Sequence, residues 1–163
     1  MAIRRRRSRR PDRQRGEKHG WLWFDRYRLI HQEVLANHPF VVSDRTQFIE
    51  ISGSGSRIRC SGLIVCRRDI EIEVDKRLDV RTVDNRVQVR GARYRYHARV
   101  LDGQAGRNVL RYDSGHSHSP GVYHRHEYDL ATGEDRLTTL SREEFPVLGE
   151  MVDELAAMFS DAR

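Results

Sequence analysis

The sequence lacks any long apolar run. No window of its 163 residues approaches the ~18 consecutive apolar residues of a membrane-spanning helix. The arginine-rich start is not followed by the apolar stretch that a signal peptide carries. These two absences predict a cytoplasmic protein with no membrane partner.

Cysteine is also scarce. The chain holds two cysteines, Cys60 and Cys66, which are too few for a disulfide framework. On one strand they would face the same side about 20 Å apart, beyond the reach of a disulfide, so we expect small buried thiols. The length excludes a multidomain enzyme and predicts a single domain, which buries about 68–70% of the surface that the unfolded chain exposes.

Apolar side chains are nearly absent from residues 1–19, which hold only three. Residues 1–18 carry nine basic and two acidic side chains, a net charge of +7, which leaves −1 for the remainder of a chain whose total is +6. Such a segment cannot offset the entropy of ordering. We therefore predict a disordered arginine-rich tail over 1–19 and one domain over 20–163. The tail arginines expected to attract nucleic acid are Arg4, Arg5, Arg6, Arg7, Arg9 and Arg10.

Two stretches have the spacing of amphipathic helices. Near the start, an apolar face predicts a helix over 24–37 from Trp23, Tyr27, Ile30 and Val34. The stripe that predicts the C-terminal helix consists of Phe145, Leu148, Val152, Leu155 and Phe159. Ser141 and Glu144 have the spacing of a capping box, and Pro146 shifts the expected start of this helix by two residues.

Between these helices the apolar period changes to two, which is typical of strands. The Gly-Ser stretch 52–56 lacks the Lys-Ser/Thr of a phosphate loop and is predicted to be a hairpin turn. The acids that alternate with Ile70 and Ile72 are predicted surface groups, and Gly91 a bulge. The fold class expected is α+β, an antiparallel meander of six or seven strands flanked by an N-terminal and a C-terminal helix.

The sharpest signal is a cluster of histidines. Five of the eight lie between 97 and 126: His97, His116, His118, His124 and His126. Residues two apart on a strand share a face, so His124 and His126 point the same way. His116 and His118 fall in a Ser/Gly/Pro loop, where surface exposure is the default expectation.

Basic side chains accompany these histidines. Arg93, Arg95, His97 and Arg99 share one face of a predicted strand, opposite the face of Tyr94 and Tyr96. Three guanidiniums make a poor core and a good phosphate-binding surface, so these arginines are predicted to bind nucleic acid. Arg111 and Asp113 share a face of the next strand. If the three strands are neighbours, the set His97, Arg111, Asp113, His124 and His126 converges.

Several chemistries are open to that set. Cleavage of RNA without a metal needs a base, an acid and a cation for the phosphorane charge, and histidine titrates in the right range. A metal site would instead use His124 and His126 with His97, His116 or Asp113 as the third ligand. Taken singly, each histidine is more often a solvated or core side chain.

Three short runs carry a family resemblance. Tyr94-Arg-Tyr-His97, Leu110-Arg-Tyr-Asp113 and His124-Arg-His126, ahead of a C-terminal helix, resemble the TumE-type toxin family of bacterial toxin–antitoxin systems over roughly residues 50–160. The resemblance implies a small toxin that acts on RNA or translation, encoded beside a helix-turn-helix antitoxin that neutralises it. Ser114 follows the aspartate where the family pattern often has Asn, and the tail and first helix extend beyond the shared core.

The leading hypothesis is a toxin-like, metal-independent ribonuclease that needs no cofactor. His97 and either His124 or His126 serve as acid and base, Arg111 binds the phosphate, and Asp113 orients a histidine. The alternatives are a non-enzymatic nucleic-acid- or ribosome-binding protein and a histidine-based metal-binding protein.

Overall fold

The computed structural model describes residues 20–51, 57–103, 105–116 and 119–160, with the side chains of 105, 115–116 and 119–121 left aside. Three expectations from the sequence lie outside the described residues: the disordered tail 1–19, the hairpin turn 52–56 and the position of His118. In the described part of the chain, no helix is long and apolar enough to cross a membrane.

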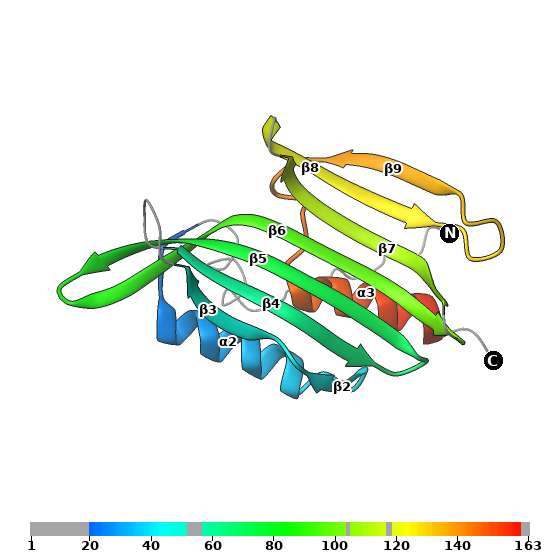
Figure 1. Ribbon diagram of the computed structural model, residues 1–163, viewed down its shortest axis with the longest axis horizontal. Helices are drawn as coiled ribbons and strands as arrows, with labels where there is room; N and C mark the ends of the chain where they lie inside the picture. Colours follow the sequence, from blue (N-terminus) through cyan, green and yellow to red (C-terminus); the bar gives the residue numbers. More distant parts are fainter. Residues whose placement is uncertain (1–19, 52–56, 104, 117–118, 161–163) are drawn as a thin grey trace, which may run out of the picture.

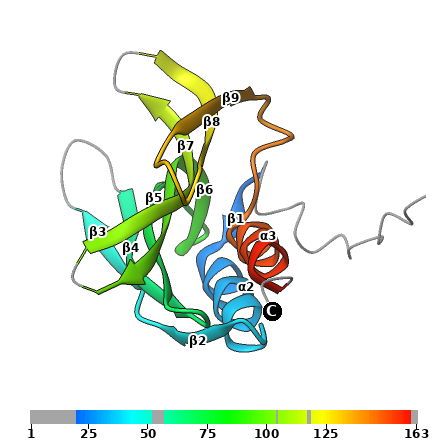
Figure 2. The same ribbon diagram turned by 90° about the vertical axis from the view of Figure 1, so that its right-hand side faces the viewer.

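One antiparallel sheet with two helices on the same face makes up the described chain (Figures 1 and 2). The strand order is β2-β4-β5-β6-β7-β8-β9, with β3 also paired to β4 and β1 to β6. The elements are β1 Leu22–Trp23, α2 Phe24–Ala36, β2 Val41–Asp44, β3 Gln47–Ile51, β4 Arg57–Cys66, β5 Ile70–Val83, β6 Arg86–Asp102, β7 Ala105–His116, β8 Ser119–Tyr128, β9 Asp135–Leu140 and α3 Leu148–Ser160.

This architecture confirms the predicted α+β class and the meander order. The described sheet has nine strands rather than six or seven. Strand β9 has no counterpart among the predicted strands because it is exposed over almost its whole length, and a strand without a buried face has no apolar alternation to detect. Two expected strands near residues 78 and 70 are instead one, β5, and the bulge expected at Gly91 is confirmed as a register shift opposite Arg77 and Leu78.

The first helix matches its prediction to within one residue, but its buried face differs. The helical spacing places Trp23 on that face, whereas this residue lies in β1, ahead of the helix. The buried residues of α2 are Tyr27, Ile30, His31 and Leu35. Burial, with a smaller contribution from the nearby charge of Lys76, lowers the pKa of His31 to about 3, so this histidine is neutral in the folded protein.

The second helix begins at Leu148, later than the start that a cap at Ser141 and a two-residue shift by Pro146 predicted. The capping box forms in the turn before the helix: the Glu144 amide donates to Ser141 Oγ at 3.3 Å, and the Ser141 amide donates to Glu144 Oε2 at 2.8 Å. The helix is then tied to the sheet by Glu154, which accepts hydrogen bonds from Tyr112 Oη and Arg125 Nη2, both at 2.6 Å. Helix α3 therefore holds β7 and β8 in place from behind.

The core lies between the sheet and the two helices (Figure 2). The alternation in β5 is as predicted, with Ile70, Ile72 and Val74 buried. Cys60 and Cys66 are buried, as expected, and no disulfide joins them. Burial raises the pKa of the Cys66 thiol to about 11. One core position is charged: Lys76 is fully buried, with Nζ 3.3 Å from Tyr27 Oη.

A close crossing of the chain constrains β4. Gly62 has φ +148°, and a Cβ added there would collide with the backbone carbonyl oxygen of Arg45. Because this oxygen belongs to the backbone and cannot rotate away, Gly62→Ala is expected to destabilise the protein by about 1–3 kcal/mol. Urea denaturation measures this, with Gly20→Ala, where a Cβ meets no atom within 4 Å, as the control. Equal stability of the two variants would contradict the prediction.

Candidate functional site

The three strands that carry the predicted site are neighbours in the sheet. Strand β7 pairs with β6 on one side and β8 on the other, which places Arg111 opposite both His97 and His126. The adjacent row places Asp113 opposite both Arg95 and His124. The predicted adjacency is thus confirmed, whereas the catalytic roles stay predictions.

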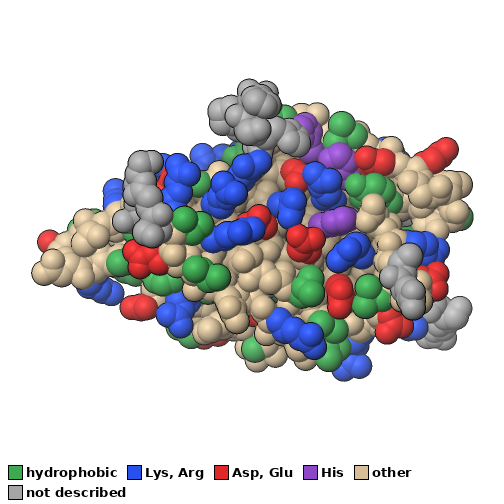
Figure 3. Space-filling model, in the orientation of Figure 1, with side chains coloured by type: hydrophobic (Ala, Val, Ile, Leu, Met, Phe, Trp, Pro, Cys, Tyr) green, Lys and Arg blue, Asp and Glu red, His purple; other side chains and the backbone are tan. Residues whose placement is uncertain are grey.

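These side chains stand on the open face of the sheet, away from the helices. Tyr96, Ala98, Leu110 and Tyr112, which alternate with them along β6 and β7, are buried in the core instead. Figure 3 shows Lys and Arg side chains (blue) gathered beside histidines (purple) over the middle of this face. Among the described elements the helices cover only the other face, which leaves this surface open to a large ligand.

Asp113 is the centre of the cluster. Its carboxylate accepts a hydrogen bond from Arg111 Nε at 2.6 Å, and its Oδ2 lies 3.8 Å from His126 Nε2. The aspartate is 6% exposed, whereas the Arg111 side chain is 33% exposed. Although burial of Arg111 opposes its charged form, the hydrogen bond to Asp113 and the charge of that carboxylate raise the pKa of Arg111. Asp113 therefore orients a guanidinium that solvent or a ligand still reaches.

His126 is held between two carboxylates. Its Nδ1 lies 2.9 Å from Asp135 Oδ2, on the side away from Asp113, and its ring stacks on Tyr128 at 6.3 Å and 14°. The ring of His124 lies 6.4 Å from that of His126 between centroids. One nitrogen of the His126 ring is thus hydrogen-bonded to Asp135, and the other faces Asp113 across 3.8 Å.

His97 has a different environment. Its Nε2 lies 2.9 Å from Asn108 Oδ1, so the ring donates from Nε2 and leaves Nδ1 as the proton acceptor. Burial lowers the pKa of His97, with a further contribution from the charges of Arg99 and Arg111, against the opposing effect of the hydrogen bond to Asn108. His97 and His126 are two strand spacings apart, roughly 10 Å, with Arg111 between them.

Sequence reasoning missed three members of this site: Asn108, Tyr128 and Asp135. Tyr128 could have been predicted, because alternation along β8 puts it on the same face as His124 and His126. Asp135 lies on the strand that had no apolar pattern. Asn108 meets His97 only because the β6–β7 register shifts between Ala98 and Arg99, and a register shift of this kind has no sequence signal of its own.

A hollow lined with arginines lies beside the histidine site. It is bordered by Asp75, Arg77, Arg93, Tyr94, Arg95, Arg111 and Asp113. Arg95 is paired with Glu73 at 2.8 Å. Over the described chain, the side chains of Arg77 and Arg93 form no hydrogen bond or ion pair, although they lie opposite one another across β5 and β6. Like charges placed opposite one another destabilise a sheet, so this hollow suits an anion.

The other predicted nucleic-acid-binding arginines differ in accessibility. Arg93 and Arg95 are exposed. Arg99 is half-buried, and its Nε is buried without a hydrogen-bond partner among the described residues. The tail arginines Arg4 to Arg10 lie outside the described residues.

The metal alternative depends on three ligands lying close together. Among the residues the structure describes, no group of three or more His, Cys, Asp or Glu side chains is placed to hold a metal ion. His97 is separated from His124 and His126 by the whole of β7. The side chain of His116, the other histidine considered as a third ligand, is not among those described.

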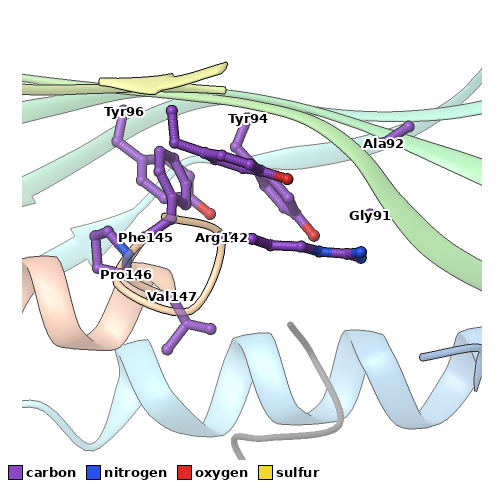
Figure 4. A pocket seen from close by; sticks show the side chains of 9 residues that line it. Gly91, Ala92, Tyr94, Tyr96, Arg142, Phe145, Pro146 and Val147 are labelled. Atoms are coloured by element: carbon purple, nitrogen blue, oxygen red, sulfur yellow. The ribbon is translucent and has the colours of Figure 1, made fainter. Parts of the chain in front are cut away.

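An aromatic pocket lies behind the site, on the face that the helices cover (Figure 4). Tyr94 and Tyr96 of β6 approach Phe145 and Pro146 of the segment before α3, and Arg142 extends along the same pocket. Gly91 is required here, because a Cβ at this position would collide with the Tyr94 ring. Through these rings the segment before α3 supports the back of the strand that carries His97.

Comparisons with protein-family models, with curated proteins and with solved structures gave no match to this chain.

Proposed function

We propose that this protein is a metal-independent ribonuclease that cleaves RNA on the open face of the sheet. The observation that carries the proposal is the row His97–Arg111–His126 across three paired strands, with Asp113 in contact with both Arg111 and His126. A cation flanked by two imidazoles is what transfer of a phosphoryl group to a neighbouring hydroxyl requires.

The environments of the two histidines assign their roles. His97 is the base, because its lowered pKa keeps it neutral and its Nδ1 is free to accept a proton. It removes the proton of the RNA 2′-hydroxyl, whose oxygen attacks the adjacent phosphorus and forms a 2′,3′-cyclic phosphate. His126 donates a proton to the 5′-oxygen as the P–O5′ bond breaks. Arg111, held by Asp113, stabilises the charge on the phosphorane.

The biological role proposed is that of a toxin in a bacterial toxin–antitoxin system. It is supported by the three motifs that resemble TumE-type toxins, whose histidines, arginine and aspartate are the residues gathered in this site. The role implies a helix-turn-helix antitoxin as partner, RNA as target and a cytoplasmic location. A neighbouring gene for a small helix-turn-helix protein would support it.

The test is to express the wild type and a His124→Ala/His126→Ala variant from a tightly controlled promoter. The proposal predicts slowed growth and degraded RNA with the wild type and normal growth with the variant. His38→Ala is the matched control, since His38 pairs with Asp153 of α3, remote from the open face. Equal growth and equal RNA integrity for all three proteins would reject the proposal. Cleavage by purified protein should persist in EDTA, and loss there would favour the metal alternative.

The pH dependence of cleavage provides a second prediction. A base acts only when unprotonated, so the acidic limb of the rate profile is expected below 6.5, the ordinary histidine value, because the pKa of His97 is lowered. Asn108→Leu removes a hydrogen bond that raises this pKa, and should move the acidic limb to still lower pH. Rates of cleavage of a dinucleotide across the pH range measure both, and an unmoved limb in Asn108→Leu would exclude His97 as the base.

A non-enzymatic RNA- or ribosome-binding protein is the second candidate. The observation that favours it is the pair of exposed arginines, Arg77 and Arg93, whose side chains form no hydrogen bond or ion pair within the described chain, together with the +7 of residues 1–18. A binder loses affinity and salt dependence when the tail charge is removed and never cleaves. A ribonuclease keeps its cleavage chemistry when tail residues 2–18 are deleted.

A further inference from the structure

The hairpin of β5 and β6 extends beyond the rest of the molecule as an arm (Figure 1). We define the arm as residues 79–90 together with Trp21 and the short strand β1, whose Leu22 and Trp23 pair with β6. Its tip is a two-residue turn, Asp84–Asn85, with φ +48° and +59°, the left-handed conformation that Asp and Asn tolerate in tight hairpins. The arm is therefore an ordered structure and not a loose loop.

Three arginines of the arm stack on its two tryptophans. The guanidinium carbons of Arg81 and Arg90 lie 4.4 Å and 4.8 Å from the centre of the Trp21 ring. Arg86 lies 4.1 Å from the centre of the Trp23 ring. Arg81 Nε donates to Gln88 Oε1 at 2.8 Å and Arg90 Nη2 donates to Asp79 Oδ2 at 3.4 Å. The other N–H groups at the edges of these stacked guanidiniums match phosphate oxygens in geometry. Stacking thus holds the three cations in fixed positions with little further loss of entropy on binding.

These groups lie on the same side of the sheet as the proposed catalytic row. Arg86 and Arg90 are each two residues from Gln88 along β6, so the three side chains point to the same face. Gln88 is opposite both Arg81 and Trp23, which therefore share that face. Val89, between Gln88 and Arg90, is fully buried on the helix side. Past the bulge the open face continues through Arg93 and Arg95 to His97, as Figure 3 shows in the run of blue side chains across this face. The arm, the arginine hollow and the histidine site form one basic strip.

We propose that the arm is a second RNA-binding site, which grips the sugar-phosphate backbone of a strand whose scissile bond lies at the His97–Arg111–His126 row. The inference rests on the proposed function for the identity of the polymer as RNA. From His97 to Arg86 the chain covers about 36 Å at 3.3 Å per residue of strand. A polynucleotide spans that distance and a single nucleotide does not, so the substrate class that uses both sites is a long RNA.

The first test compares RNA binding by the full chain carrying Arg81→Gln, Arg86→Gln and Arg90→Gln with the wild type. Removal of one phosphate contact should reduce the slope of log K against log salt by about 0.7 for a single strand, and affinity for long RNA should fall about tenfold or more. The control carries the same charge change on exposed arginines away from the strip: Arg26→Gln, Arg28→Gln and Arg107→Gln. Equal slopes for the two triple variants would overturn the inference.

Intrinsic fluorescence gives a second readout, because Trp21 and Trp23 are the two tryptophans of the chain. Long RNA should change their emission in a salt-sensitive manner, and a dinucleotide should leave it unaltered. Emission that is indifferent to long RNA would overturn the inference. The arm variants should cleave a dinucleotide at the wild-type rate; if they fail to, the arm acts through the fold and the inference is wrong.

These experiments distinguish failure of the ribonuclease proposal from failure of the arm proposal. If the wild type cleaves nothing but the arm variants lose affinity and salt slope, the arm binds RNA and the ribonuclease proposal falls. If the wild type cleaves RNA and the arm variants bind it as well as the control does, the ribonuclease stands and the arm proposal falls. A parallel measurement with DNA of the same sequence shows whether the arm recognises the phosphate backbone alone.

Discussion

Replacing His126 by glutamine is expected to lower the rate of RNA cleavage by about 10²–10⁴-fold, the contribution of a single acid or base. Glutamine retains a hydrogen-bond donor, as His126 has toward Asp135, but cannot release a proton to the 5′-oxygen. The measurement is the single-turnover rate on a dinucleotide and on long RNA. His97→Gln should produce a loss of the same order, because base and acid act in the same step.

Two variants separate catalysis from structure in this experiment. His38→Gln changes a histidine on the helix side, which pairs with Asp153 at 2.9 Å, and should cleave at the wild-type rate. Asp113→Asn should cleave RNA at a rate between those of the wild type and His126→Gln, because it leaves His126 in place but weakens the hold on Arg111. If His126→Gln cleaves as fast as His38→Gln while both fold normally, His126 is not the acid, and the same test on His124 decides between the pair.

Replacing Phe145 by alanine is expected to reduce the free energy of unfolding by about 3–5 kcal/mol, the usual cost of removing a buried aromatic ring. Phe145 is 4% exposed. Its ring centre lies 5.3–6.1 Å from those of four tyrosines, Tyr94, Tyr96, Tyr112 and Tyr123, which come from three different strands. One side chain therefore joins β6, β7 and β8 from behind.

Urea denaturation measures this loss. Phe159→Ala is the control, because Phe159 lies at the end of α3 and is only partly buried against the same core. This variant should lose clearly less of the free energy of unfolding than Phe145→Ala does. A loss below about 0.5 kcal/mol, the size of an ordinary surface substitution, would show that the aromatic cluster does not hold the sheet together. Phe145→Ala should also impair RNA cleavage in proportion to the unfolded fraction.

Both predictions depend on the alternation of side chains between the two faces of a strand. Tyr96 and Tyr112 point into the aromatic core, and their neighbours His97 and Asp113 point to the open face. Packing behind the sheet thus fixes the rotation of each strand about its own axis, and with it the direction of every site residue. A small shift in register would turn the histidines of β8 into the core.

Local patterns of apolar residues in the sequence were enough to predict much of this fold. Alternation in β5 and β6 predicted which residues are buried, and the helical stripes predicted α2 and α3, because burial on one face leaves a periodic trace in the sequence. The same rule placed Arg93, Arg95 and His97 on one face before any strand pairing was known. The two-residue spacing of His124 and His126 likewise determined that they point the same way.

Strand pairing and contacts between distant segments were decided only by the tertiary structure. That His97, Arg111 and His126 form one row depends on the β6–β7 and β7–β8 registers, and register arises from the packing of whole strands. Asp135 joins the site from an edge strand with no buried face to mark it. Trp23 has helical spacing in the sequence but lies on the arm, because pairing of β1 with β6 and stacking by Arg86 outweigh that local pattern. The sequence by itself therefore determined which side chains share a face, and the three-dimensional packing determined which of those faces meet.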